Sequence, residues 1–195
     1  MNRATWTFFL AAAFAACSQA SPLLTLLPAG GTVSGPPGAV VGWGFALTDT
    51  APSQWVLLTG SQFTGSPLFG TYVDYLSSVN APLYVVGPSP ESSMLNVAWN
   101  GSTLAGLGEF DINSTASFVN IPGNIVVHYS VFSQDPLDPN FDPDTSTVVP
   151  DATFSSPAQV DIAPEPGSAW MILALLPLVW LLRRHGIARP SRRPC

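Results

Sequence analysis

The feature that most restricts the fold is a series of short apolar runs separated by turn signals. Between residues 23 and 162, runs of about four to nine residues rich in Val, Phe, Tyr and Trp alternate with Gly-, Pro-, Asn- and Asp-containing turns, at a spacing of about eight to twelve residues. This spacing is typical of a two-sheet sandwich, and no stretch of this region sustains the period of an amphipathic helix. The sequence therefore predicts an all-β fold, an antiparallel β-sandwich. Strands are expected at residues 23–26, 40–47, 54–59, 69–76, 82–86, 94–99, 104–112, 116–121, 125–132 and 159–162, and residues 146–154 could add another.

Charge is divided between the middle and the ends of the chain. All six basic residues are arginines, at position 3 or from position 183 onward, whereas all twelve acidic residues except Glu165 lie between residues 49 and 161. A domain with only negative side chains repels phosphate backbones, so no nucleic-acid partner is expected. Its carboxylates must be solvated, accept backbone hydrogen bonds or bind cations.

The N-terminus has the layout of a secretory signal peptide. Arg3 precedes an apolar stretch at residues 6–16, which is too short to span a bilayer, and a small-x-small cleavage site ends at Ala20. Residues 1–20 are therefore predicted to be removed. Cleavage before Cys17 with lipidation is the alternative. Because the two cysteines are Cys17 and Cys195, the domain between them has no disulfide, cysteine nucleophile or thiolate metal site.

The C-terminal segment, residues 163–195, predicts a membrane anchor. An apolar stretch at residues 167–182 would form a single transmembrane helix of about 24 Å, short for a bilayer but workable with tryptophans at both interfaces. Arg183 and Arg184 then mark the cytoplasmic end and stop transfer. With the signal peptide, this places the domain of residues 21–162 outside the inner membrane.

The tail resembles a known sorting domain. The motif Pro164-Glu165-Pro166, the tryptophan-bearing apolar span and the terminal arginines are similar to the PEP-CTERM domain of exported bacterial proteins. The resemblance implies a Gram-negative envelope and an exosortase-type sorting enzyme as partner. It also implies processing near the motif, with release or transfer of the domain to the cell surface, often alongside exopolysaccharide. Proline at position 177 and the extension beyond the arginines depart from the family pattern.

An acidic, proline-rich loop is the best candidate for a metal site. Residues 133–145 read SQDPLDPNFDPDT, in which closely spaced oxygen ligands on a stiff loop could gather calcium. The alternative is a solvated connector whose aspartates cap their own turns. Otherwise no cofactor is expected. The candidate ligands are Asp135, Asp138, Asn140, Asp142 and Asp144.

No catalytic motif stands out, and the protein is predicted not to be an enzyme. His128 is the only histidine of the domain and has no nucleophile elbow nearby in sequence, while Glu109 and Asp111 share a strand face without further support as a glycosidase pair. The aromatic residues Trp43, Trp55 and Trp99 are either core residues or sugar-stacking platforms.

Taken together, these patterns predict an exported surface or extracellular-matrix protein, sorted through its tail, whose domain is structural or adhesive. An envelope polysaccharide-binding module is the alternative, and an exported hydrolase is the least supported. Exposed aromatic rings on one sheet face would favour sugar binding, and a cleft joining His128 to Ser and Asp would favour the hydrolase.

Overall fold

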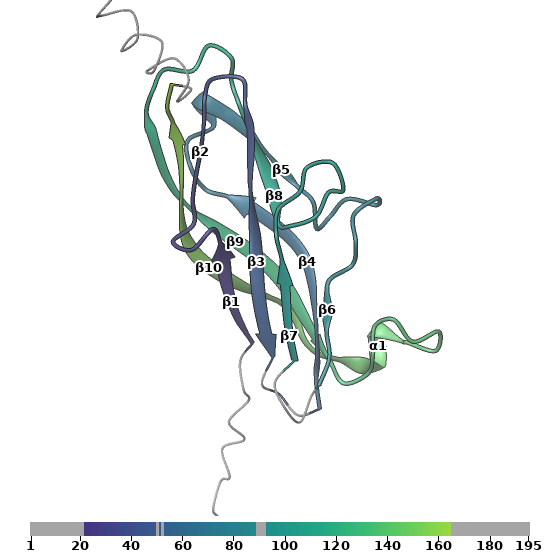
Figure 1. Ribbon diagram of the computed structural model, residues 1–195. Coiled ribbons are helices and arrows are strands. Elements are labelled where there is room, and N and C mark those ends of the chain that lie inside the picture. The colour runs from purple at the N-terminus through teal and green to yellow at the C-terminus, as the bar shows by residue number, and fades with distance from the viewer. Residues whose placement is uncertain (1–21, 50, 52, 89–92, 165–195) are drawn as a thin grey trace, which may run out of the picture.

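The computed structural model describes residues 22–49, 51, 53–88 and 93–164, which form a two-layered β-sandwich (Figure 1). The predicted all-β class is confirmed. The first sheet has the strand order β1-β3-β8-β5, and β7 pairs with β3 beside β8; the second has the order β2-β10-β9-β4-β6. The first sheet consists of β1 (Leu23–Leu27), β3 (Val40–Asp49), β5 (Gly70–Asp74), β7 (Ser93–Val97) and β8 (Gly108–Ile112). The second consists of β2 (Thr32–Gly35), β4 (Trp55–Phe63), β6 (Val85–Val86), β9 (Asn120–Phe132) and β10 (Thr147–Ile162).

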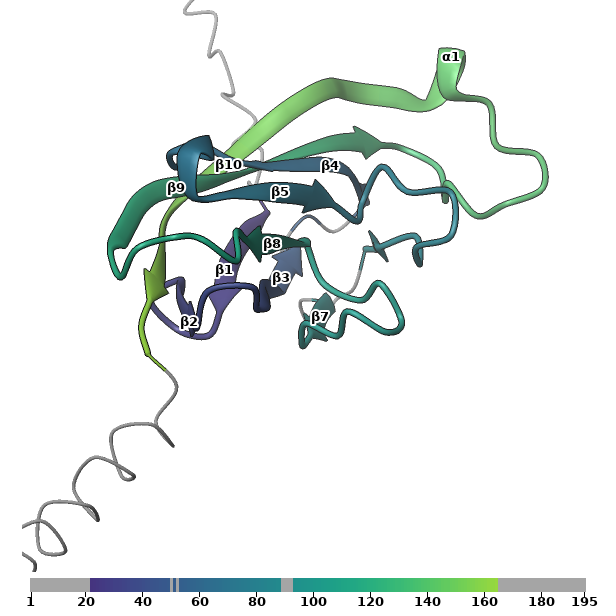
Figure 2. The ribbon, with the colours of Figure 1, turned by 90° about the horizontal axis from the view of Figure 1, so that it is seen from above.

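The core lies between the two layers, which Figure 2 shows with β9 and β10 above β1 and β3. Strand β3 alternates as its sequence predicts: Trp43, Phe45 and Leu47 are fully buried, and Ala46 points to the opposite face. Val127 of β9 and Val160 of β10 oppose them from the second sheet and are also fully buried. Alternating apolar side chains from both sheets therefore close one core without a disulfide.

Strands β9 and β10 form a long antiparallel ribbon, although the sequence predicts that each is interrupted. Residues 116–121 and 125–132 were expected to be two strands, but pairing with β10 continues through Pro122 and Gly123. Residues 146–154 and 159–162 likewise belong to one strand, through Pro157. The turn signals failed because each proline lies where its own strand has a single neighbour: β4 pairs with β9 only over residues 125–132, and β2 pairs with β10 only over residues 159–162. A proline is tolerated where a strand lacks its second neighbour.

One pairing corrects the expectation of a purely antiparallel sandwich. Strand β2 runs parallel to the end of β10, with Val33 opposite Val160. None of the predicted strands covers these residues, because Thr32–Gly35 lies between Gly-Gly and Pro-Pro turns and its partner is distant in sequence. Other expected strands are shorter than predicted: residues 69–76 give Gly70–Asp74, 82–86 give Val85–Val86, 94–99 give Ser93–Val97 and 104–112 give Gly108–Ile112. Of the expected strand 116–121, only its last two residues belong to β9.

Two short helices complete the described chain. The 3-10 helix η1 (Pro67–Phe69) precedes β5, and α1 (Pro143–Ser146) ends the loop between β9 and β10. Figure 1 shows this loop extending away from the sandwich. In the part of the chain described, no helix has the length and apolarity needed to cross a membrane.

Candidate functional site on the outer face of the first sheet

The loop that joins β7 to β8 builds one wall of the site. Asn100 and Ala105 exchange two backbone hydrogen bonds, of 2.9 and 3.0 Å, which close a tight loop that begins with Asn-Gly, a pair of residues typical of turns. The Asn100 side-chain oxygen accepts a further bond from the Ser102 N–H at 3.0 Å. Gly106 then returns the chain to β8 with φ 114°, a conformation that favours glycine. The loop is thus fixed by its own hydrogen bonds.

Trp99 lies against the outer face of β3, over a glycine. A Cβ atom at Gly42 would lie 2.2 Å from the Trp99 Nε1 atom, so no other residue fits beneath the ring. Gly44 makes room for the backbone of the same segment, since its Cβ would lie 2.3 Å from the Val97 carbonyl oxygen. Glycine inside a strand often marks such a close approach. The Trp99 ring remains half-exposed, while its N–H is buried near the Tyr75 hydroxyl without completing a hydrogen bond to a described group.

Tyr75 and Glu109 form the polar floor beside Trp99. The hydroxyl of the buried Tyr75 donates a hydrogen bond to Glu109 Oε2. Burial, followed by this bond and the charge of Glu109, raises the pKa of Tyr75 well above its ordinary value of 10.0. The hydroxyl therefore stays protonated and holds the carboxylate in place, with its other oxygen available as an acceptor.

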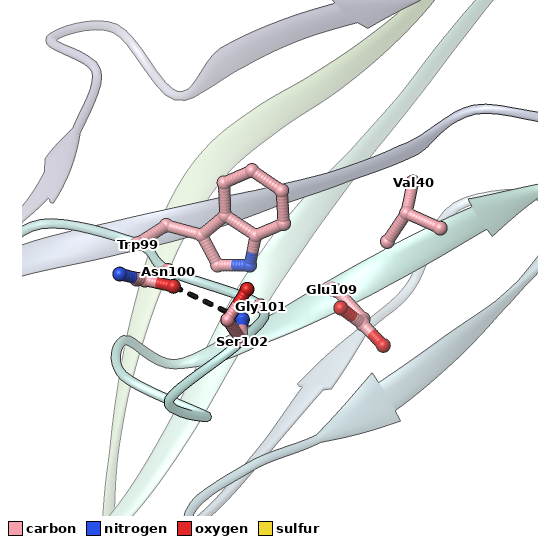
Figure 3. Close-up of a pocket in the computed structure, with 6 residues that line it drawn as sticks. All are labelled: Val40, Trp99, Asn100, Gly101, Ser102 and Glu109. Carbon is pink, nitrogen blue, oxygen red and sulfur yellow. Dashed lines mark hydrogen bonds between the residues drawn. The ribbon is translucent and has the colours of Figure 1, made fainter.

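Two open hollows flank the Trp99 ring. The larger is about 500 Å³, and Figure 3 shows its lining residues, with the indole ring between Val40 and the loop and Glu109 opposite the loop. The second is about 310 Å³ and includes Trp99 and Gly42. Both are shallow and open to solvent rather than enclosed. The larger hollow is lined by Val40, Trp99, Asn100, Gly101, Ser102 and Glu109, and the smaller by Pro28, Thr32, Val33, Ser34, Val41, Gly42 and Trp99.

The three tryptophans considered as sugar-stacking platforms have different environments, and Trp99 lies just beyond the end of β7. Trp43 is fully buried, and its Nε1 donates to the Gly31 carbonyl at 2.7 Å, so it is a core residue. Trp55 is half-buried and packs against Gly87, where a Cβ would lie 2.4 Å from the ring. Only Trp99 lines both hollows. The core interpretation is therefore confirmed for Trp43 but does not extend to Trp99.

The acidic loop lies apart from this site and does not gather its side chains. Asp135, Asp138 and Asp142 each accept a hydrogen bond from the backbone N–H two residues later, at 2.8, 2.8 and 3.0 Å. Asp144 lies in the first turn of α1, and the Asn140 amide donates to Asp138 at 3.2 Å. The side chains thus cap their own turns, as the connector interpretation expects. Across the described residues, no group of three or more His, Cys, Asp or Glu side chains is placed to hold a metal ion.

The residues considered for catalysis lie in two separate places, His128 on the surface of β9 and the pair Glu109 and Asp111 on β8. His128 Nδ1 lies 2.8 Å from Asp151 Oδ1, but the pair is on the surface, with side chains 36% and 74% exposed. The Ser130 hydroxyl oxygen accepts a 3.4 Å hydrogen bond from the Asp151 backbone N–H. Glu109 and Asp111 lie on the same face of β8 as predicted, and the first is held by Tyr75.

The residues predicted to control sorting lie mostly outside the described chain. Pro164 is described and exposed, just after β10 ends at Ile162. Glu165, Pro166, Arg183, Arg184 and the expected helix at 167–182 are outside the described residues, as are the signal peptide and Cys17.

Comparison with known proteins adds no family. No protein-family model matches the chain, and no curated protein matches it. One solved structure with a detectable likeness is the sixth cohesin of scaffoldin B from Acetivibrio cellulolyticus, in complex with a Cel5 dockerin mutant. It is 12% identical, the match covers 72% of this chain and 97% of that one, and the TM-score is 0.26. A superposition this poor carries no inference about function.

Sequence reasoning missed the assembly of this site. It considered Trp99 and Glu109 separately and did not single out Tyr75 or Gly42. The usable signal was the pair of glycines on either side of Trp43, because two glycines on the same face of a strand indicate that something packs closely there.

Proposed function

We propose that this chain is an exported surface or extracellular-matrix protein whose β-sandwich is structural or adhesive and whose tail is a temporary sorting anchor. The separation of charge along the chain carries the proposal. An arginine-free acidic domain lies between an N-terminal segment of signal-peptide type and an apolar, arginine-terminated tail.

The end of the fold supports the same division. Ile162 is buried as the last residue of β10, the Ala163 N–H donates to the Gly35 carbonyl at 3.2 Å, and Pro164 is exposed. The sandwich core is thus complete where the Pro-Glu-Pro motif begins. Cleavage at or after the motif would remove no core residue and leave the domain folded.

The sorting proposal also implies the partners and the location of the chain. The chain would be held transiently in the inner membrane with its domain in the periplasm, recognised by an exosortase-type enzyme, and then released or transferred to the surface. Exopolysaccharide is the expected neighbour there. No catalytic role is proposed for the domain.

Intact-mass analysis of the protein from the medium and cell surface of a Gram-negative producer tests the proposal. We expect a chain beginning near Ser21 and ending near Pro166. A chain that begins at a lipid-modified Cys17 would instead support the lipoprotein alternative. Glu165→Ala should cause the uncleaved form to accumulate, and Asp144→Ala, an acid-to-alanine control on the domain surface, should not. An extracellular protein intact through Cys195 would overturn the sorting proposal.

A second function, binding of envelope polysaccharide, is favoured by one observation. The half-exposed Trp99 lies between two open hollows with a carboxylate, an amide and hydroxyl groups around it.

A further inference from the structure

We propose that the outer face of the first sheet at Trp99 binds a neutral polysaccharide, with one sugar unit in each of the hollows beside the ring. The inference rests on the polysaccharide-binding function above and assigns to it a site and a ligand class. It is independent of how the tail is processed.

The first argument is the match between the hollow and a pyranose ring. A sugar has apolar C–H faces and a rim of hydroxyl groups, so its binding site needs an aromatic surface beside hydrogen-bonding groups. The larger hollow supplies the Trp99 ring together with Val40, and around them the Glu109 carboxylate, the Asn100 amide and the Ser102 hydroxyl. This mixture of apolar surface and few polar groups is usual for ligand sites.

Preorganisation is the second argument. Gly42 fixes the depth of the indole ring, Tyr75 orients Glu109, and the Asn100–Ser102 hydrogen bond holds the loop. A ligand would therefore meet groups already in position, which reduces the entropic cost of binding. Gly42 and Gly44 allow this close approach of the ring and of the backbone that carries it.

The negative charge of the domain favours a neutral polysaccharide over an acidic one. The domain carries no lysine or arginine, and Glu109 and Asp111 lie on the same outer face. The carboxylates of a uronic-acid polymer would be repelled by this surface. A cationic peptide would suit the charge, but it would need more than the single carboxylate that lines the hollows, and that carboxylate already accepts the Tyr75 hydrogen bond.

The presence of two hollows indicates a chain rather than a single sugar. Trp99 lines both, and the smaller continues over Gly42 to the hydroxyl-bearing residues Thr32 and Ser34. An extended polymer could pass across the ring with sugar units on either side, so affinity should rise with oligosaccharide length.

The test uses the full-length chain purified in mild detergent and titrated with a neutral β-glucan oligosaccharide series. Polygalacturonate and a poly-lysine peptide are parallel probes. We expect saturable binding of the neutral series, with affinity increasing with length, and no binding of polygalacturonate.

Trp99→Ala should weaken binding about tenfold or more, the scale expected when one aromatic contact is lost. Because Trp99 also packs on β3, Trp99→Phe and Ser102→Ala provide gentler changes, each expected to weaken binding severalfold. Phe118→Ala removes a 63% exposed aromatic residue outside the hollows and should bind like the wild type.

Three results would overturn this inference. They are no binding of the neutral series, whether or not poly-lysine binds; equal affinity in the Trp99→Phe, Ser102→Ala and wild-type proteins; or binding of polygalacturonate as tight as that of the neutral series. None of them would affect the cleaved C-terminus expected of the sorting proposal, so the two can fail separately.

Discussion

The two faces of the first sheet carry tryptophans that are built into the protein in opposite ways. On the inner face, Trp43 is fully buried and its N–H completes a 2.7 Å hydrogen bond to Gly31. On the outer face, Trp99 is half-exposed, rests on a glycine and lines two hollows. The inner ring satisfies its contacts within the fold, whereas the outer ring is held in place with part of its surface open. The comparison suggests that the first stabilises the sandwich and the second is available for a ligand.

The largest effect should come from removing the inner ring. Trp43→Ala is expected to reduce the free energy of unfolding by about 3–5 kcal/mol, because a large cavity replaces the side chain and the Gly31 carbonyl loses one of its two donors. Urea denaturation of the full-length chain measures the change. Phe118→Ala, at an exposed position, should stay within about 0.5 kcal/mol of the wild type. A similarly small loss for Trp43→Ala would contradict the role given to the inner face.

A polar network centred on Ser61 links β4 to β5 and should also contribute to stability. Ser61 Oγ lies 2.8 Å from the Tyr72 hydroxyl, 2.6 Å from Asp74 Oδ1 and 2.7 Å from the Leu107 carbonyl oxygen. Ser61→Ala should cost about 1–3 kcal/mol, since buried polar groups lose their shared partner. Ser77→Ala, at an exposed serine, is the matched control. Equal stability of the two variants in urea would show that the network does not contribute.

Removing the Tyr75 hydroxyl should have a smaller effect on the outer face. Tyr75→Phe deletes the hydrogen bond to Glu109 while the ring still fills its place, and we expect a loss of about 1 kcal/mol. Glycan binding should weaken as well, because Glu109 is no longer oriented. Calorimetric titration beside urea denaturation separates the two effects. Unchanged affinity would exclude Tyr75 as a positioning residue.

The free energy of unfolding should fall at alkaline pH because of the buried tyrosines. Burial is the largest cause that raises the pKa of Tyr72 and of Tyr75 above 10.0, so both remain neutral in the folded state when unfolded tyrosines ionise. A raised folded-state pKa gives stability that is complete below the unfolded pKa and is lost as pH rises above it. Unfolding free energy should therefore be level up to about pH 10 and fall beyond it. In the Tyr72→Phe variant the fall should be shallower, and an identical slope would contradict the assignment.

Sequence patterns predicted the inner face better than the outer one. Alternation in residues 40–47 places Trp43, Phe45 and Leu47 inside, because burying large apolar side chains dominates the energetics of such a strand. The outer site depends on contacts between Trp99, Gly42 and Glu109 that no periodicity encodes. The strand β2 was missed for the same reason, since its partner in β10 is supplied only by the tertiary fold. In the acidic loop, each of Asp135, Asp138 and Asp142 accepts a hydrogen bond within its own turn, an arrangement that spacing in the sequence alone does not distinguish from a shared cluster.

The most direct test of this division between the two faces is to measure unfolding and glycan binding on the same two variants, Trp43→Phe and Trp99→Phe. We predict that Trp43→Phe loses more than about 1 kcal/mol of stability while its affinity for the neutral glucan is retained. Trp99→Phe should lose less than half as much stability, and its affinity should fall severalfold. If both variants lose stability equally and neither loses affinity, the two tryptophans have the same role and the account is wrong.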